Sequence, residues 1–311
     1  MTDGAQKTRL VLAVCTYQRN EPLAVLLRAM VVSATRLGDR AAVGVVVVDD
    51  SSDGQARVVV DQFVDQFALG VHYLRSGHQN ISRARNLALD RAIELADWVA
   101  MTDDDCEPSP EWLSALLEVQ QRTGADAIAG PYHRRVAPGS PPWLLEQPFL
   151  EIATFQREDG ARISLAGTNN SLISSRWLRA HPEVRFQLNL GVTGGEDVVF
   201  FRSALAAGLR IHFARNAVVY ENEPPSRATL AYQLWLFLWL GNGSYVTRRE
   251  TAQATPLRMF LQGGNHVRKA LQRPLSRVFR GQPPQLRYCL ADVLYGLGEL
   301  LGVLGVRIPH H

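Results

Sequence analysis

The stretch Met101–Leu117, MTDDDCEPSPEWLSALL, decides how the rest of the chain is interpreted. An apolar run that ends at Met101 is followed by three carboxylates, Asp103, Asp104 and Asp105, and then by a helical pattern. This order predicts a buried strand that ends in an acidic turn. Carboxylates about 4 Å apart repel one another by about 1 kcal/mol even in water, so we expect a cation among them. A solvated acidic loop is the alternative.

The composition is that of an ordinary soluble protein. The 311 residues allow one large domain or two smaller ones, with 46% hydrophobic and 20% charged residues. Cys15, Cys106 and Cys289 lack the spacing of a zinc site or a disulfide framework, which favours a reducing cytosol. Residues 1–8 are polar, so we do not expect export and predict a cytoplasmic protein.

The charge is unevenly distributed along the chain. The net charge is +3, but from Tyr245 onward ten Lys or Arg residues face only Glu250, Asp292 and Glu299. This tail carries +7, and residues 1–244 carry −4. A basic tail on a weakly acidic body predicts a partner with an anionic surface.

Apolar strand patterns alternate with helical patterns over the first part of the chain. We expect strands at Arg9–Cys15, Val43–Val48, Val71–Leu74 and Trp98–Met101, and helices from Pro22, over 55–67 and over Ile81–Leu95. Such alternation predicts a mostly parallel sheet, in which ligands bind at the carboxyl ends of the strands. Thr16 to Arg19, Asp49 and the acidic turn all follow strands.

Other nucleotide-binding motifs do not fit. No Gly-x-Gly-x-x-Gly follows the first strand, where Thr16–Asn20 stands, and no Walker sequence is present. Asp49, Asp50 and Asp53 match the spacing of isoprenoid synthases, but those enzymes are all-helical and this motif follows a β-branched run.

A series of motifs in a fixed order carries a resemblance. The motifs are CTYQRN, VVVVDDSSDG, NISRARNLAL, MTDDDCEPSPEWL, GTNNSLIS and GGEDVVFF. Over residues 9–226 the chain resembles family 2 of the inverting nucleotide-sugar glycosyltransferases, and it is most similar to the bacterial glucosyltransferases of succinoglycan-type exopolysaccharide synthesis.

The resemblance implies an α/β structure of the GT-A fold, with a mostly parallel central sheet flanked by helices. The catalytic domain would cover 1–226, with a nucleotide-binding half at 9–130 and an acceptor half at 131–226. A helical, basic C-terminal region would follow at 227–311. The implied reaction moves a hexose, glucose, from its UDP form to a saccharide or lipid-linked saccharide.

Donor contacts follow from the matched motifs. By resemblance, Asp49 accepts the N3–H of uracil, and Thr16, Tyr17 and Arg19 contact the donor from the first turn. For Asp49, a turn-forming residue is the alternative. Asp103 and Asp104 are also expected at the donor.

A divalent metal, Mn²⁺ or Mg²⁺, is the implied cofactor. The family's Asp-x-Asp motif matches Asp105, with Asp103 as the second candidate ligand. Arg83 and Arg85 lie at the start of a predicted helix, where cationic side chains and free N–H groups both meet phosphate. A solvent-exposed basic turn is the alternative for the two arginines.

The acceptor side is assigned to later motifs. By resemblance, Asp197 is the general base and Glu196 orients the acceptor, while Gly195 permits a close approach of the backbone. Acids in a first helical turn also simply oppose the helix dipole. Asn169 and Asn170 are expected to line the acceptor cleft, unless they are only turn formers.

Trp143 and Glu221 are two further positions that bear on the site. Trp143 could stack on a sugar ring, with a satellite hydrophobic contact as the alternative. Many family members carry a histidine after a strand like Ala217–Tyr220, but this chain has Glu221. That carboxylate adds negative charge, for which Arg215 or Arg227 could compensate.

The tail is expected to be helical. Leu230–Leu240 is too short to cross a bilayer, and Tyr288–Val306 carries Asp292 and Glu299 on one helical face. With the basic residues around it, this pattern predicts a helix lying on anionic lipid. The alternative is a helical subdomain packed on the body or on a second protomer in a homo-oligomer. No nucleic-acid-binding module accompanies the charge.

Two other functions are weighed against the transferase. One is a non-catalytic sugar-nucleotide-binding scaffold of a polysaccharide assembly complex, which would not need every catalytic carboxylate. The other is a sugar nucleotidylyltransferase, but its glycine-rich N-terminal loop is missing.

Overall fold

The computed structural model describes residues 7–145, 157–251 and 255–309. The chain divides into two compact units, which are described separately here. Of the described residues, the first contains 7–135, 157–191 and 200–222, and the second contains 136–145, 192–199, 223–251 and 255–309. Two short internal segments thus join the C-terminal helices in the second unit.

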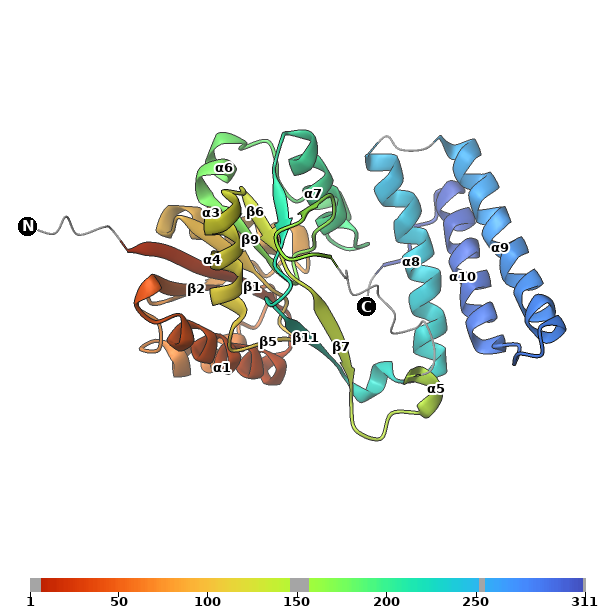
Figure 1. The fold of residues 1–311 in the computed structure, drawn as a ribbon, viewed down its shortest axis with the longest axis horizontal. Helices are drawn as coiled ribbons and strands as arrows, with labels where there is room; N and C mark the ends of the chain where they lie inside the picture. Colours follow the sequence, from red (N-terminus) through yellow and green to blue (C-terminus); the bar gives the residue numbers. More distant parts are fainter. Residues whose placement is uncertain (1–6, 146–156, 252–254, 310–311) are drawn as a thin grey trace, which may run out of the picture. The chain divides into compact units, whose positions relative to one another are not determined.

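Strands and helices alternate over residues 8–101, and three successive helices end the described chain (Figure 1). The strands are β1 Thr8–Thr16, β2 Ala41–Asp49, β3 Val71–Arg75, β4 Trp98–Met101, β5 Cys106–Pro108, β6 Ala127–Ala129, β7 Tyr132–Val136, β8 Arg162–Ile163, β9 Ser171–Ser174, β10 Ile211–Phe213 and β11 Val219–Glu223. The α-helices are α1 Asn20–Leu37, α2 Ala56–Val60, α3 Ile81–Leu95, α4 Trp112–Thr123, α5 Pro142–Leu145, α6 Ser175–Ala180, α7 Glu196–Ala206, α8 Leu230–Glu250, α9 Pro256–Phe279 and α10 Leu286–Val303.

The central sheet has eight strands in the order β3-β2-β1-β4-β9-β6-β10-β8. The first four strands are parallel, and β9 runs antiparallel between β4 and β6. Ala13 of β1 pairs with Met101 of β4, and Met101 pairs with Ser171 at the start of β9. The ends of β1 and β4 and the beginning of β9 therefore meet at one edge of the sheet, where the predicted polar turns lie.

Each face of the sheet has its own apolar core, because successive side chains of a strand point to opposite faces. Leu10, Leu12 and Val14 pack with α1, α2 and α4, whereas Val11 and Ala13 pack with α3, α6 and α7. The β-branched run of β2 is buried on both faces, as expected of a central parallel strand. The predicted α/β class and mostly parallel first half are confirmed.

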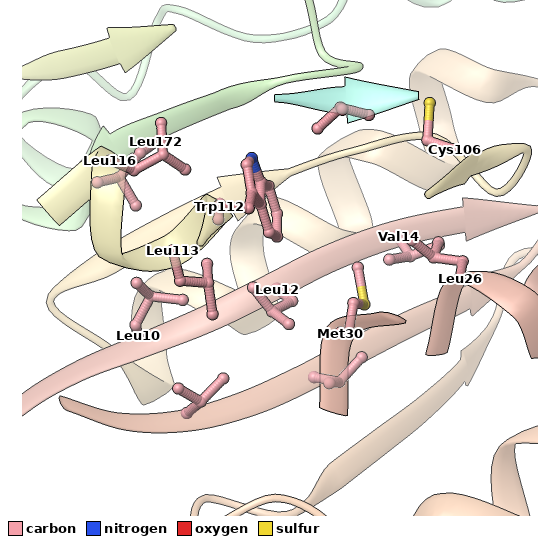
Figure 2. Close-up of a cluster of buried hydrophobic side chains, with 14 of the residues drawn as sticks. Leu10, Leu12, Val14, Leu26, Met30, Cys106, Trp112, Leu113, Leu116 and Leu172 are labelled. Atoms are coloured by element: carbon pink, nitrogen blue, oxygen red, sulfur yellow. The ribbon is translucent and has the colours of Figure 1, made fainter. Parts of the chain in front are cut away.

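Trp112, at the start of α4, links the core to the functional edge. Its ring lies among apolar side chains, and its indole nitrogen points away from Leu12 and Met30 (Figure 2). That nitrogen donates a hydrogen bond of 2.8 Å to Oδ1 of Asn170, which directly precedes β9. A wholly buried aromatic residue thereby anchors a loop at the carboxyl edge of the sheet.

Two predicted elements differ from the structure. The helix expected over 55–67 ends as α2 at Val60, followed by a 3-10 turn, because the chain must reverse into β3 through Gly70 with a φ of 75°. Phe63 and Phe67 are still buried, so turns satisfy the apolar pattern that suggested a helix. The strand expected at Ala217–Tyr220 is β11, two residues later, and Glu221 lies inside it.

In the second unit, α8, α9 and α10 lie side by side (Figure 1). Glycines allow the close contacts: a Cβ at Gly241 would lie 2.0 Å from the Tyr295 carbonyl oxygen, and one at Gly298 would lie 2.1 Å from that of Leu238. Within the described residues, no helix is both long and apolar enough to span a bilayer.

Candidate active site

The acidic turn after β4 is held by protein cations. Asp104 is 5% exposed, and its Oδ2 accepts a hydrogen bond of 2.8 Å from the Thr16 hydroxyl at the end of β1. Nη1 of Arg19 lies 2.9 Å from Oδ1 of Asp104 and 3.0 Å from Oδ2 of Asp105. Arg85 of α3 donates a hydrogen bond of 2.8 Å to Oδ1 of Asp103. Arg19 and Arg85 thus neutralise part of the negative charge of the turn.

The electrostatics of the turn follow from this arrangement. Burial raises the pKa of Asp104 to about 6, although Arg19 works in the opposite direction. Burial also acts on Arg19, but the Asp104 and Asp105 carboxylates hold its pKa above the ordinary value. Asp103 and Asp105 keep more contact with solvent, with side chains 38% and 16% exposed. These two carboxylates, and not Asp104, can present oxygen atoms to a ligand.

A cavity of about 10 Å³ lies beside Arg85, Asp103, Cys15 and Thr168. It is at most the size of one water molecule. Burial raises the pKa of the Cys15 thiol, which is consequently not a nucleophile at neutral pH. The cavity shows that the end of β1, the start of α3 and the turn before β9 are close neighbours.

Of the other predicted donor residues, Tyr17 is 39% exposed beside buried Thr16 and is accessible to a ligand. Arg83 is exposed, and its guanidinium lies 3.1 Å from Nε2 of His78. Arg83 thus belongs to an exposed turn, whereas Arg85 is only 12% exposed and ion-paired to the acidic turn. The two arginines were predicted together, and the structure separates them.

Asp49 does not fit the predicted nucleobase contact. Its side chain is wholly buried, and it accepts hydrogen bonds from the Ser51 amide and hydroxyl, the Ala56 amide and the Tyr73 hydroxyl. No surface of the carboxylate is left for a base. Asp49 instead holds the turn between β2 and α2, as the alternative interpretation expected.

Asp50 was missed by the sequence reasoning. Side chains alternate along a strand, so Asp50 follows Val48 toward the face that carries α3, whereas Asp49 follows Val47 toward the other face. Oδ1 and Oδ2 of Asp50 accept hydrogen bonds of 3.1 and 2.6 Å from the amides of His78 and Asn80. The alternation of side chains along a strand could have identified Asp50, because it places Asp49 and Asp50 on opposite faces of the sheet.

The turn before β9 contains both predicted asparagines. Asn170 is 2% exposed; its amide donates to the carbonyl oxygens of Pro131 and Ala217 and accepts from Trp112. All its polar atoms are used inside the fold, so it has a structural role in place of the expected acceptor contact. Asn169 is partly exposed at the same edge of the sheet.

The Gly194-Gly195 pair lies before α7, in the second compact unit. Both residues have a positive φ, 83° and 84°, and a Cβ would lie 2.4 Å from Trp239 and 2.5 Å from Thr247, respectively. The glycines are therefore required by close packing against α8. They are followed by Glu196, 6% exposed, and by the more accessible Asp197, in the first turn of the helix.

Trp143 and Glu221 are the last two of the residues that were singled out from the sequence. Trp143 packs in a small cluster with Leu144 and Ala291, and the Arg287 guanidinium lies 5.5 Å from its ring centre, as the satellite-contact interpretation expected. Glu221 pairs with Cys106 across β5 and β11, and the Asn222 amide donates to the Asp105 carbonyl. Glu221 thus lies one residue from the acidic turn. In the described part of the chain, no three His, Cys, Asp or Glu side chains form a ready metal site.

Comparison with known proteins identifies the fold and the family. The model of the glycosyl transferase family 2 matches residues 12–181. Over 308 residues, the chain is 32% identical to the succinoglycan biosynthesis protein ExoM of Rhizobium meliloti (strain 1021), covering 95% of this chain and 93% of that protein.

Solved structures of S. aureus TarS share the fold. TarS 1-349 in complex with UDP has a TM-score of 0.53 at 16% identity, with 96% of this chain and 92% of that chain covered. The complex of the same protein with UDP-GlcNAc has a TM-score of 0.54 at 15% identity, with the same coverage. The predicted GT-A architecture is confirmed. The protein is a glycosyltransferase and belongs to glycosyl transferase family 2.

Proposed function

We propose that this glycosyltransferase transfers a hexose, glucose, from its UDP form to a saccharide or lipid-linked saccharide in bacterial polysaccharide biosynthesis, with inversion at the anomeric carbon. The name of the ExoM relative supports the pathway, and the TarS complexes with UDP and UDP-GlcNAc support a UDP-sugar donor. The observation that carries the proposal is the joining of Thr16, Arg19 and the acidic turn at one edge of the sheet.

The proposed donor site uses the residues that remain accessible at this edge. Tyr17 offers a partly exposed ring to the nucleoside, and buried Asp50, which accepts hydrogen bonds from the amides of His78 and Asn80, supports the chain just before α3. Arg19 and Arg85 hold positive charge next to the position proposed for the diphosphate. Guanidinium groups bind phosphate oxygens through paired N–H donors, so both arginines can exchange a carboxylate partner for the donor.

The donor set of the acidic turn fits a divalent cation. Asp103 and Asp105 are partly exposed and present hard oxygen ligands of the kind that Mg²⁺ and Mn²⁺ prefer. When bound, the cation would supply positive charge that stabilises the departing diphosphate. Asp104 is buried against Thr16 and would orient the turn instead of contacting the cation.

On the acceptor side, we assign the proton transfer to Asp197. A carboxylate used as general base takes the proton of the attacking hydroxyl as the new glycosidic bond forms and the bond to the diphosphate breaks. Glu196 is more deeply buried and is proposed to orient the acceptor. Asn169, partly exposed before β9, is proposed as an acceptor contact.

The test is release of UDP from UDP-glucose by the purified full chain with Mn²⁺, together with thermal shifts by UDP. Arg19→Met and Asp105→Asn should weaken UDP-dependent stabilisation, which is about 2.7 kcal/mol for a ligand at 100 times its dissociation constant. Arg36→Met is the matched control, because Arg36 lies at the other end of α1 and pairs with exposed Glu111. UDP binding without turnover of any UDP-hexose, with or without saccharide acceptors, would support the non-catalytic scaffold.

A further inference from the structure

The outward face of α9 carries exposed apolar side chains toward both of its ends. Leu257, Leu261, Leu271, Leu275 and Phe279 are 62–90% exposed. Their spacings of four, ten, four and four residues bring them onto one stripe of a helix with 3.6 residues per turn. Five apolar side chains of this size rarely gather on one exposed helix face of a soluble protein, so the stripe indicates a contact surface.

The interface between α8, α9 and α10 is unusually polar. Glu299 of α10 is wholly buried, and its carboxylate lies 2.7 Å from Nδ1 of His266 and 3.7 Å from Nη1 of Arg248. Asp292 forms an ion pair with Arg273 of α9. The acids of α10 thus face neighbouring helices, which corrects the expectation that they form the solvent face of an amphipathic helix.

The helices also contact one another through small residues. A Cβ at Gly296 would lie 2.9 Å from the Gly263 carbonyl oxygen, and one at Gly302 would lie 2.8 Å from the Tyr245 ring. Ion pairs and glycines inside, with leucine and phenylalanine outside, reverse the usual distribution in water. Helix pairs that contact lipid use small and polar residues at their interfaces in this way.

The positive charge of α9 indicates what kind of partner binds the apolar stripe. The helix contains no Asp or Glu, and Arg258, Arg268 and Lys269 are exposed along it, with exposed Arg280 just after its end. Two copies of this face brought together would place cation against cation. An anionic surface instead attracts these residues by about 1 kcal/mol for each Lys or Arg near it.

We propose that α9 docks onto an anionic lipid bilayer, with Leu257, Leu261, Leu271, Leu275 and Phe279 inserted among the acyl chains and the cations among the headgroups. The helix would lie in the plane of the membrane surface, since no described helix can span it. The proposal stands on the helical unit alone and is independent of the reaction assigned to the catalytic site.

The test is cosedimentation of the full chain with vesicles of phosphatidylcholine alone or mixed with phosphatidylglycerol. We expect binding to the mixed vesicles and at least tenfold weaker binding of the double variant Leu275→Glu, Phe279→Glu. Val32→Glu is the matched control: Val32 is a 51% exposed apolar residue of α1 and should leave binding unchanged. The double variant should retain the cooperative thermal melt and the far-UV circular dichroism of the wild type, which shows that it is folded.

Arg258→Glu combined with Lys269→Glu should reduce binding to mixed vesicles by a similar factor, and added salt should weaken wild-type binding. Equal sedimentation of wild type and both double variants would overturn the proposal. It would also be overturned if the chain ignored vesicles but formed a dimer that the Leu275→Glu, Phe279→Glu variant separated, because the occupant would then be a second copy. Vesicle binding needs no turnover, so its outcome is distinct from that of the transferase assay.

Discussion

The unit that contains the central sheet and the C-terminal helices distribute charge in different ways. In the first, apolar cores cover both faces of the sheet, and ionised groups gather at the edge where strands end. In the second, Glu299 is buried between helices, whereas Phe279 is 90% exposed. Charge at an edge is available to a ligand, whereas the apolar outer surface over a charged interior is the basis of our proposal of a lipid partner.

The largest expected effect concerns the acid pair that begins α7. Asp197→Asn keeps the size of the side chain but removes the proton acceptor, so transfer should fall by about 10² to 10⁴. UDP binding, measured by calorimetry, should stay unchanged. Asp126→Asn is the control variant, because Asp126 pairs with Arg210 away from the predicted site. The transfer rate of this variant should stay near that of the wild type. An Asp197→Asn enzyme with full activity would remove Asp197 from the mechanism.

The charged edge of the sheet should make the metal-free protein sensitive to pH. Because burial raises the pKa of Asp104 to about 6, the folded state binds a proton more tightly than the unfolded state, whose carboxyl titrates near its ordinary value of 3.8. The contribution of Asp104 to the free energy of unfolding is then largest below about pH 4 and falls as the pH rises to about 6.

The loss in the free energy of unfolding that Asp104 causes is at most about 3 kcal/mol, because its pKa is shifted by roughly two units. Urea unfolding at several pH values would measure it, with Asp104→Asn as the reference that lacks the titration. Parallel pH profiles for the wild type and Asp104→Asn would show that Asp104 does not titrate in this range.

The charged interior of the helical unit gives a smaller expected effect. Glu299→Ala removes the partner of His266 and Arg248, whose side chains are 46% and 30% exposed and so regain some hydration. We expect a loss of about 1–3 kcal/mol in the free energy of unfolding. Glu250→Ala, at the exposed end of α8, is the control and should cost no more than about 0.5 kcal/mol. A loss equal to that of the control would show that the buried carboxylate does not stabilise the helices.

The smallest effect on stability should come from the outward face of α9. Leu275→Ser replaces a side chain that is 64% exposed, so the free energy of unfolding in water should change by less than about 0.5 kcal/mol. Ala270→Ser, one of the inward positions of the same helix, should cost more because the site is 1% exposed. A Leu275→Ser loss above that of Ala270→Ser would mean that Leu275 is buried in solution.

The sequence predicts the catalytic fold well because its signals are local. Strands such as β2 are continuous β-branched runs, and Arg9–Cys15, Ile81–Leu95 and Trp98–Met101 correspond closely to β1, α3 and β4. The helix over 55–67 was too long, since the buried pair Phe63 and Phe67 has the same spacing in a helix and in these turns. Periodicity records which side chains are buried, but not which backbone buries them.

The site was less predictable because pairing depends on distant residues. Three adjacent aspartates give no local sign that Arg19 and Arg85 would neutralise them or that Thr16 would bind the middle one. Likewise, the matched motif suggested Asp49, but only the enclosed turn reveals that its carboxylate is inaccessible. The inward orientation of Asp292 and Glu299 depended on the neighbouring helices in the same way.

The arginine that bridges Asp104 and Asp105 has a consequence for how the protein is made. A newly synthesised chain can neutralise its own acidic turn, so folding need not wait for an inorganic ion to be captured. Dialysis against a chelator should leave a cooperative thermal melt intact. The cation proposed for Asp103 and Asp105 would then serve the reaction and not the assembly of the fold.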